Sequence, residues 1–178
     1  VVPTLSVAEI YTDNVSLTPN ALKQGDLVTQ VIPSISIAGT GARLKFNATI
    51  APQVLYYAQG KQDNQIYPQL KASGSAELAK QLLFVDAGAN IGQQNVSLLG
   101  PLTTTNVNTT GNRATVETYF VSPYLRRDFG SEVQAEARYA YSVVNSNDPA
   151  ALADSVGNLV HLRLGSGPAY KLLAWNLD

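Results

Sequence analysis

Residues 42–57 read ARLKFNATIAPQVLYY, and this stretch decides the fold that the sequence predicts. Every second residue from Ala42 to Tyr56 is apolar, whereas the residues between them begin with Arg43, Lys45 and Asn47. Because strand side chains point alternately to opposite faces, the stretch predicts a strand with one apolar and one largely polar face. At about 3.3 Å per residue it would span about 40 Å or more, which is long for a strand of a soluble domain.

The same period of two recurs along the chain, and no helical period of comparable strength occurs. The segment 4–12 carries Glu9 on the same parity as Leu5, Val7 and Tyr11, so its alternation does not assign its faces. A last segment begins at Leu172. The sequence therefore predicts an all-β chain with nine strand segments. Besides 42–57, they are 4–12, 27–38, 66–78, 82–93, 114–126, 133–143, 159–166 and the segment from 172 onward.

Short and long connections alternate between these segments. This alternation is typical of an antiparallel up-and-down meander whose two ends face different environments, as in outer-membrane barrels with short turns on one side and longer loops on the other. A soluble sandwich has no reason to segregate its loops by length in this way. The short connections are 39–41, 79–81, 128–131 and 167–171. The long ones are 15–26, 59–65, 95–113 and 145–158.

The charged residues of the best segments avoid the apolar parity. In a transmembrane β-barrel the apolar parity faces lipid, where a charge costs about 2–4 kcal/mol near the midplane, and the polar parity faces a wet interior. Tyrosines at segment ends or on the apolar parity suit an interfacial girdle, although half-buried sheet aromatics would look the same. The polar residues that we expect to face the lumen are Arg43, Lys45, Lys71, Asp86, Glu136, Arg138, His161 and Arg163.

The composition supports this interpretation and excludes several classes of protein. Charged residues make up 14% of the chain, against roughly 25% in an ordinary domain. The net charge is −1, so the composition lacks the excess of basic residues that is typical of nucleic-acid-binding proteins. No stretch approaches the roughly 20 apolar residues of a spanning helix. The absence of cysteine excludes disulfide scaffolds, thiol catalysts and cysteine metal sites.

Four prolines lie inside strand patterns, where each removes a ladder hydrogen bond. They mark either β-bulges or interruptions of the strands. We favour bulges, because the alternation continues across Pro52 and Pro68 without a slip. The prolines are Pro33, Pro52, Pro68 and Pro123.

Nine is an unusual number of strands, since bacterial single-chain barrels have an even number. We therefore expect residues 1–178 to form one β-barrel domain that is the N-terminal portion of a longer barrel. The alternative is closure by eight strands, with the last segment as a tail.

The sequence carries no constellation that predicts catalysis, a cofactor or a metal site. His161 has no nucleophile and no orienting carboxylate in a recognisable motif, so we interpret it as a polar lumen residue and expect no enzyme activity. Asp13, Asn14 and Asp26 could ligate calcium in an external loop, although turn formation explains them equally well.

Four short motifs also point to a family: YTDNV at 11–15, GTGAR at 39–43, GNR at 111–113 and SPYLR at 122–126. With them, nearly the whole chain resembles the N-terminal half of proteobacterial outer-membrane β-barrels called PEP-CTERM system-associated, which occur beside exopolysaccharide and exosortase gene clusters. The resemblance implies a location in the bacterial outer membrane and a barrel fold. It implies no substrate and no catalytic residues.

Three functions remain open. The first is an outer-membrane pore or scaffold in exopolysaccharide export or envelope assembly, with outer-membrane lipid, polysaccharide or export-machinery proteins as partners. The second is a structural protein that assembles through β-strand pairing into a larger sheet or fibre. The third is a soluble carbohydrate-binding β-sandwich.

Overall fold

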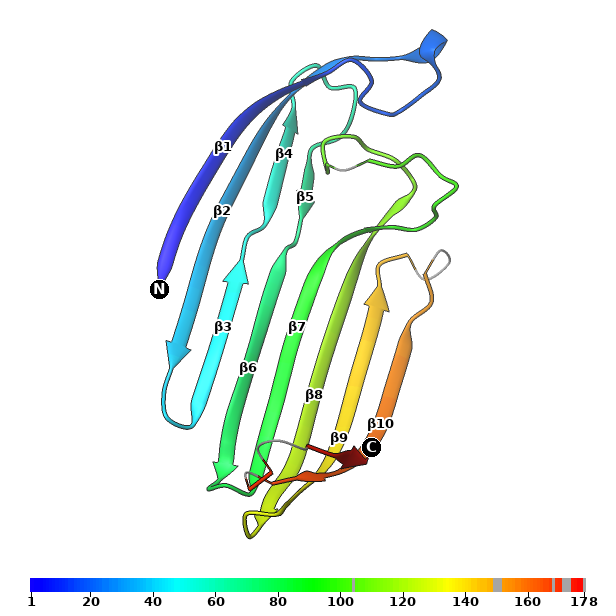
Figure 1. Cartoon of the computed structure of the whole chain (residues 1–178). Helices are drawn as coiled ribbons and strands as arrows, with labels where there is room; N and C mark the ends of the chain where they lie inside the picture. Colours follow the sequence, from blue (N-terminus) through cyan, green and yellow to red (C-terminus); the bar gives the residue numbers. More distant parts are fainter. Residues whose placement is uncertain (104, 149–151, 168, 171–173, 178) are drawn as a thin grey trace.

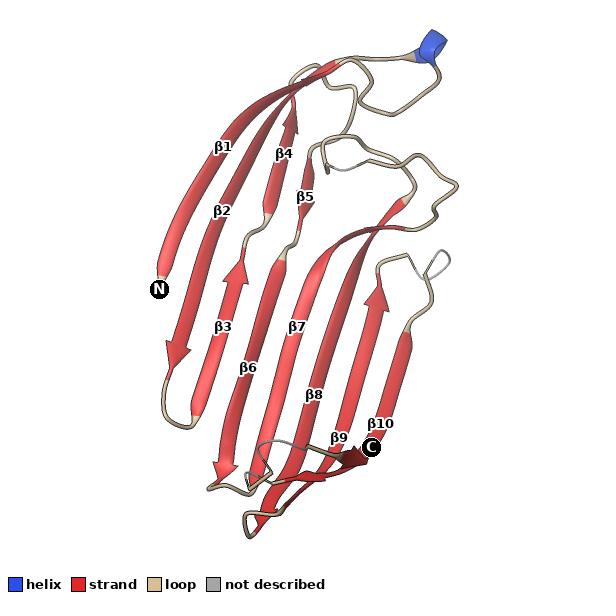
Figure 2. Ribbon diagram, in the orientation of Figure 1, coloured by secondary structure: helices blue, strands red, loops and turns tan. Residues whose placement is uncertain are grey.

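A computed structural model describes residues 1–103, 105–148, 152–167, 169–170 and 174–177 of the chain, and all its strands belong to one antiparallel sheet. A short 3-10 helix, η1 (Asn20–Leu22), is the one helical element among these residues (Figure 2). The prediction of an all-β meander is confirmed. The strands are β1 (Val2–Thr12), β2 (Asp26–Thr40), β3 (Leu44–Ile50), β4 (Gln53–Tyr57), β5 (Gln65–Tyr67), β6 (Leu70–Ala79), β7 (Leu83–Asn95), β8 (Arg113–Phe129), β9 (Val133–Ser146), β10 (Ser155–Ser166) and β11 (Asn176–Leu177).

Two long strands are each assigned in two pieces. Strand β2 pairs with both β3 and β4, and β3 and β4 pair with β6 and β5 respectively. The pieces β3 and β4 are therefore one long strand, and β5 and β6 are another. Counted in this way, the described residues form eight long strands and the short β11, in agreement with the predicted number. Leu172, where the ninth segment was expected to begin, lies outside the described residues.

The interruptions fall at prolines, and they are not bulges. The register runs from Ile35↔Ile50 to Val31↔Val54 without a shift, which places Pro33 opposite Pro52. The same argument on the next pair of strands places Pro52 opposite Pro68. Prolines with no N–H to donate thus stand side by side, so the ladder opens locally while the alternation continues. Our prediction of bulges at Pro52 and Pro68 is wrong, but the unbroken alternation that motivated it is confirmed.

The sheet is curved but not closed into a barrel (Figure 1). Within the described residues, β1 pairs with β2 alone. At the other side of the sheet, β10 pairs with β9 and, at Leu164 and Gly165 only, with β11. One edge of β1 and most of one edge of β10 therefore carry unpaired backbone groups. The described residues therefore form an open sheet and not a closed barrel.

The two ends of the sheet differ as the connection lengths predict. The turns 41–43, 80–82 and 130–132 lie at one end, which we call the turn end. The connections 13–25, 58–64, 96–112 and the one between β9 and β10 lie at the other, which we call the loop end (Figure 1).

The strand register assigns every long strand an apolar and a polar face, including β1. The pairs Leu5↔Pro33, Val7↔Val31 and Tyr11↔Leu27 place the apolar residues of β1 in line with those of β2. Glu9 lies on this apolar face and accepts a hydrogen bond from Thr29 Oγ1 at 2.8 Å. The buried core of the molecule lies on the polar face, at the loop end, as described below.

Candidate functional site

The polar face carries its charged residues mainly near the turn end, where they bond to one another across β7, β8 and β9. Arg138 Nη1 donates to Asp86 Oδ2 at 2.9 Å and to Ser122 Oγ at 3.0 Å. Its Nε donates to Glu136 Oε1 at 3.0 Å. All three ionic side chains are partly buried, with 19–32% of each exposed, so these bonds are less screened than those of a surface pair.

Aromatic rings complete this group. Phe84 and Tyr124, on β7 and β8, stack with their ring centroids 5.1 Å apart. The guanidinium of Arg138 lies 3.8 Å from the Tyr124 centroid, and that of Arg126 lies 4.7 Å from the Phe84 centroid. Such cation–π contacts stabilise the cations and hold the rings in place. We call the six residues Phe84, Asp86, Ser122, Tyr124, Glu136 and Arg138 the turn-end cluster.

The structure brings together five of the eight polar residues that the sequence predicts. Asp86, Glu136 and Arg138 are bonded as described above. In the register of β9 and β10, His161 stands opposite Arg138 and Arg163 stands opposite Glu136.

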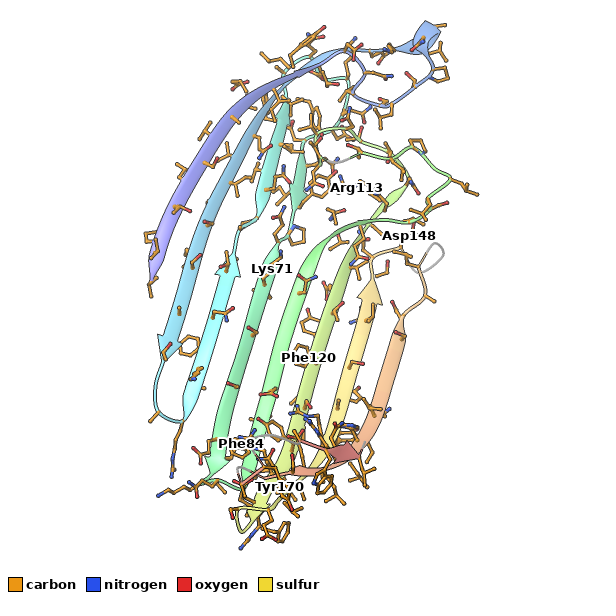
Figure 3. The ribbon with its side chains drawn as sticks, viewed as in Figure 1. Lys71, Phe84, Arg113, Phe120, Asp148 and Tyr170 are labelled. Carbon is orange, nitrogen blue, oxygen red and sulfur yellow. The ribbon has the colours of Figure 1, made fainter. Side chains whose placement is uncertain are left out.

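The other three predicted residues lie apart from this cluster. Lys45 is opposite Ser75 on the polar face. Arg43 is in the turn between β2 and β3, where its carbonyl accepts a hydrogen bond from Glu77 N at 2.7 Å. Lys71 lies nearer the loop end than Phe84 does, and Figure 3 shows it between Phe84 and Arg113 along the sheet. The sequence did not single out Phe84, Ser122 and Tyr124 of the cluster, or Arg126 beside it, although their alternation with the apolar parity of β7 and β8 places them on the polar face.

The loop end of the polar face is closed over a small apolar core. Val15 and Val107, from the first and third long connections, pack against Val28, Leu55 and Tyr57, which point from β2 and β4. All five are at most 3% exposed, and we call them the loop-end core. Leu55 and Tyr57 belong to the parity that the sequence marks as largely polar. Apolar side chains suit these two positions because loops cover them. This contact joins segments that are distant in sequence, so it cannot be predicted from the alternation of one strand.

Hydrogen bonds tie the connections to the sheet and to each other. Tyr57 Oη donates to Val107 O at 2.9 Å, and Thr109 N donates to Val15 O at 3.0 Å. The fully buried carboxylate of Asp26 accepts from Gln59 N at 2.9 Å. Three of the long connections thus form one folded cap rather than separate loops.

Between this cap and the turn-end cluster, the polar face is hollowed by a cavity of about 750 Å³, which we call the amide hollow. Its lining includes seven residues with carboxamide side chains and two threonines, together with Lys71 and Arg113, and it includes no carboxylate. Asn106, from the long connection between β7 and β8, donates a hydrogen bond to Gln53 Oε1. Arg113 Nη1 donates to Thr105 O at 2.6 Å, which holds the same connection over the hollow.

The residues considered for calcium make hydrogen bonds within the loops. The Asn14 side chain bonds to Thr18 through both its oxygen and its nitrogen, and Asp13 pairs with Lys23 at 3.0 Å. Asp26 accepts backbone N–H groups. In the described part of the chain, no group of three or more His, Asp and Glu side chains is placed to hold a metal ion.

The opposite face of the sheet is apolar and uncovered. Val160 is 70% exposed, Ile66 69% and Leu5 68%, and they belong to rows that cross the sheet from β1 to β10. Four charged residues of the described part fall in these rows, Glu9, Arg113, Glu117 and Arg127, and each lies within five residues of a strand end. The middle of the apolar face therefore carries no charge among the described residues.

Comparisons of the chain with protein-family models, with curated proteins and with solved structures find no match. No helix in the described residues is long and apolar enough to cross a bilayer. The resemblance to PEP-CTERM system-associated barrels accordingly stays a prediction.

Proposed function

We propose that the chain forms part of the wall of a bacterial outer-membrane β-barrel, which acts as a pore or scaffold in exopolysaccharide export or envelope assembly. The observation that carries the membrane assignment is the uncovered apolar face. The assignment to exopolysaccharide export rests on the family resemblance alone.

The extent of the apolar face supports a bilayer as its partner. On β9 its row runs from Val133 to Val143, which is 11 residues, and strands of about 9–11 tilted residues cross a hydrocarbon core. Soluble monomers rarely expose contiguous apolar patches larger than a few hundred Å². A face of this width on eight long strands would aggregate in water unless lipid, detergent or protein covered it.

The polar face suits a wet interior. Its mixed charges pair within the turn-end cluster, and its loop end carries amides and a folded cap. A lining of this kind suits hydrated, polar or weakly charged solutes better than a filter for ions of one sign.

A barrel wall needs partners for both open edges. In hydrocarbon, every backbone N–H and C=O needs a protein partner, so β1 and β10 would each pair with a further strand. We propose that such strands complete the barrel.

The same open edges favour the second candidate, a structural protein that assembles through strand pairing. Exposed edges of long strands are templates for pairing with other chains. Sedimentation without detergent separates the two candidates, because a fibre grows in water whereas a barrel wall needs an amphiphile. The third candidate, a soluble carbohydrate-binding sandwich, has no second sheet in the described residues to support it.

A matched pair of substitutions tests the membrane assignment. Ala137 lies on the apolar face, in the middle of the apolar row of β9, and Ala140 lies on the polar face three residues further on. The chain is refolded with phosphatidylcholine vesicles, and the fraction that floats with them and resists carbonate extraction is measured. Ala137→Arg places a charge in lipid at a cost of about 2–4 kcal/mol, so the inserted fraction falls at least about ten-fold. Ala140→Arg leaves it nearly unchanged.

Two results would contradict the membrane assignment. One is an equal effect of the two substitutions, and the other is a wild-type chain that stays monomeric in water and does not float. Planar-bilayer conductance then separates pore from scaffold: stepwise currents favour a pore, and insertion without currents favours a scaffold.

A further inference from the structure

We propose that the amide hollow binds an anionic, hydroxyl-rich solute of the chemical class of a uronic-acid oligosaccharide. This inference rests on the proposed function, because it names the solute class of the polar face that we assign to a wet interior. It is carried by the lining of the hollow and by the contrast with the turn-end cluster.

The size of the hollow and the carboxamides of its lining suit a short sugar. Ligand sites in proteins commonly measure about 300–1,000 Å³, and the hollow falls within that range at about 750 Å³. A carboxamide offers both donors and an acceptor, and so it can match a sugar hydroxyl, which is itself donor and acceptor. Six of the seven carboxamide residues of the lining lie on the polar face or in the connection above it, and they offer many such matches; the seventh, Gln93, donates to Thr115 Oγ1 instead.

Several of these amides are available to a ligand. The side chains of Gln30, Asn90 and Gln94 line the hollow and make no hydrogen bond to another described residue. In contrast, Gln53 accepts from both Asn106 and Gln69, so these three stiffen one wall. The hollow thus combines a fixed wall with uncommitted polar groups, as expected of a site that binds a hydroxyl-rich molecule in one orientation.

The charge of the hollow selects the class of sugar. Both ionic residues of its lining, Lys71 and Arg113, are cations, and no carboxylate joins them. Within the described residues Lys71 makes no ion pair, whereas Arg138 in the turn-end cluster is bonded to two carboxylates. An uncompensated ammonium among neutral amides favours a solute that supplies the missing carboxylate.

Binding of two trisaccharides to the refolded full chain in detergent micelles tests the proposal. Trigalacturonate and the neutral maltotriose are compared by isothermal titration calorimetry at low salt. We expect trigalacturonate to bind at least about ten-fold more tightly, the worth of one charge-assisted hydrogen bond, and we expect that margin to shrink as salt is added.

Lys71→Gln should remove about ten-fold of the trigalacturonate affinity and leave maltotriose unaffected. Lys45→Gln is the matched control, because Lys45 has the same charge and lies on the same face but outside the hollow. It should change neither affinity.

Equal affinity for the two sugars overturns the anionic class, and equal effects of Lys71→Gln and Lys45→Gln overturn the location. Absence of binding by a chain that still floats with vesicles overturns the inference and leaves the proposed function standing. Failure of the chain to insert into vesicles, with trigalacturonate binding retained, contradicts the proposed function instead.

Discussion

The loop end and the turn end of the polar face are formed by the same strands, yet they are stabilised by different forces. At the loop end, connections fold over aliphatic and aromatic side chains of the polar face, and the loop-end core is buried. At the turn end, the turns 41–43, 80–82 and 130–132 are too short to cover the strands, and the partly buried charges of the turn-end cluster pair with one another instead. The difference teaches that connection length decides which chemistry the polar-face positions of a strand can hold.

Among substitutions at the two ends, the truncation of a side chain in the loop-end core should have the largest effect on the free energy of unfolding. Leu55 is fully buried, so Leu55→Ala should lower the free energy of unfolding by about 2–5 kcal/mol. Leu159 also lies on the polar face, opposite Ala140, but it is 61% exposed and no loop covers it. Leu159→Ala should cost less than about 1 kcal/mol. Urea titration in detergent measures both losses, and equal losses would mean that the loops do not bury the core.

Much of this architecture could be predicted from the sequence because it depends on local pattern. Alternation located the strands, and the lengths of the connections separated the two ends. The loop-end core was missed because it depends on contacts between Val15, Val107 and strand residues that are distant in sequence. A usable signal was present: in the VLYY run of residues 54–57 the polar parity becomes apolar.

The candidate site, too, could be predicted from the sequence only in part. The sequence predicted that Asp86, Glu136 and Arg138 share a face, since parity fixes this. It did not predict that they bond to one another, because which residues become neighbours across β7, β8 and β9 depends on register. Register is set by turn geometry and by the fit of whole strands, neither of which a single segment reveals.

The turn-end cluster should respond to salt, whereas the loop-end core should not. Arg138→Gln removes the partner of two carboxylates and a cation–π contact, and it should cost about 1–2 kcal/mol given the partial exposure of the group. Raising the salt from about 0.05 M to about 1 M should reduce this loss, because ions screen the pairs. The loss from Leu55→Ala should stay the same.

Lys45→Gln serves as the control for Arg138→Gln, since Lys45 lies on the same face and has no ion pair among the described residues. We expect it to change the free energy of unfolding by less than about 0.5 kcal/mol at either salt concentration. A salt-independent loss in Arg138→Gln would show that the cluster acts through packing alone.

The smallest effect concerns the hydrogen bond that fixes the cap to the sheet. Tyr57→Phe keeps the buried ring but leaves Val107 O without the donor now 2.9 Å away, which should cost about 1 kcal/mol. Tyr56 is the neighbouring residue on the apolar face and is 55% exposed, so Tyr56→Phe is the matched control. Because the lost bond joins β4 to the third long connection, the effect should be local: limited proteolysis should cut within 96–112 several-fold faster in Tyr57→Phe, with cutting elsewhere unchanged. Faster cutting throughout the chain would instead mean that the loop-end core and the turn-end cluster unfold as one unit. The two ends would then differ in composition but not in stability.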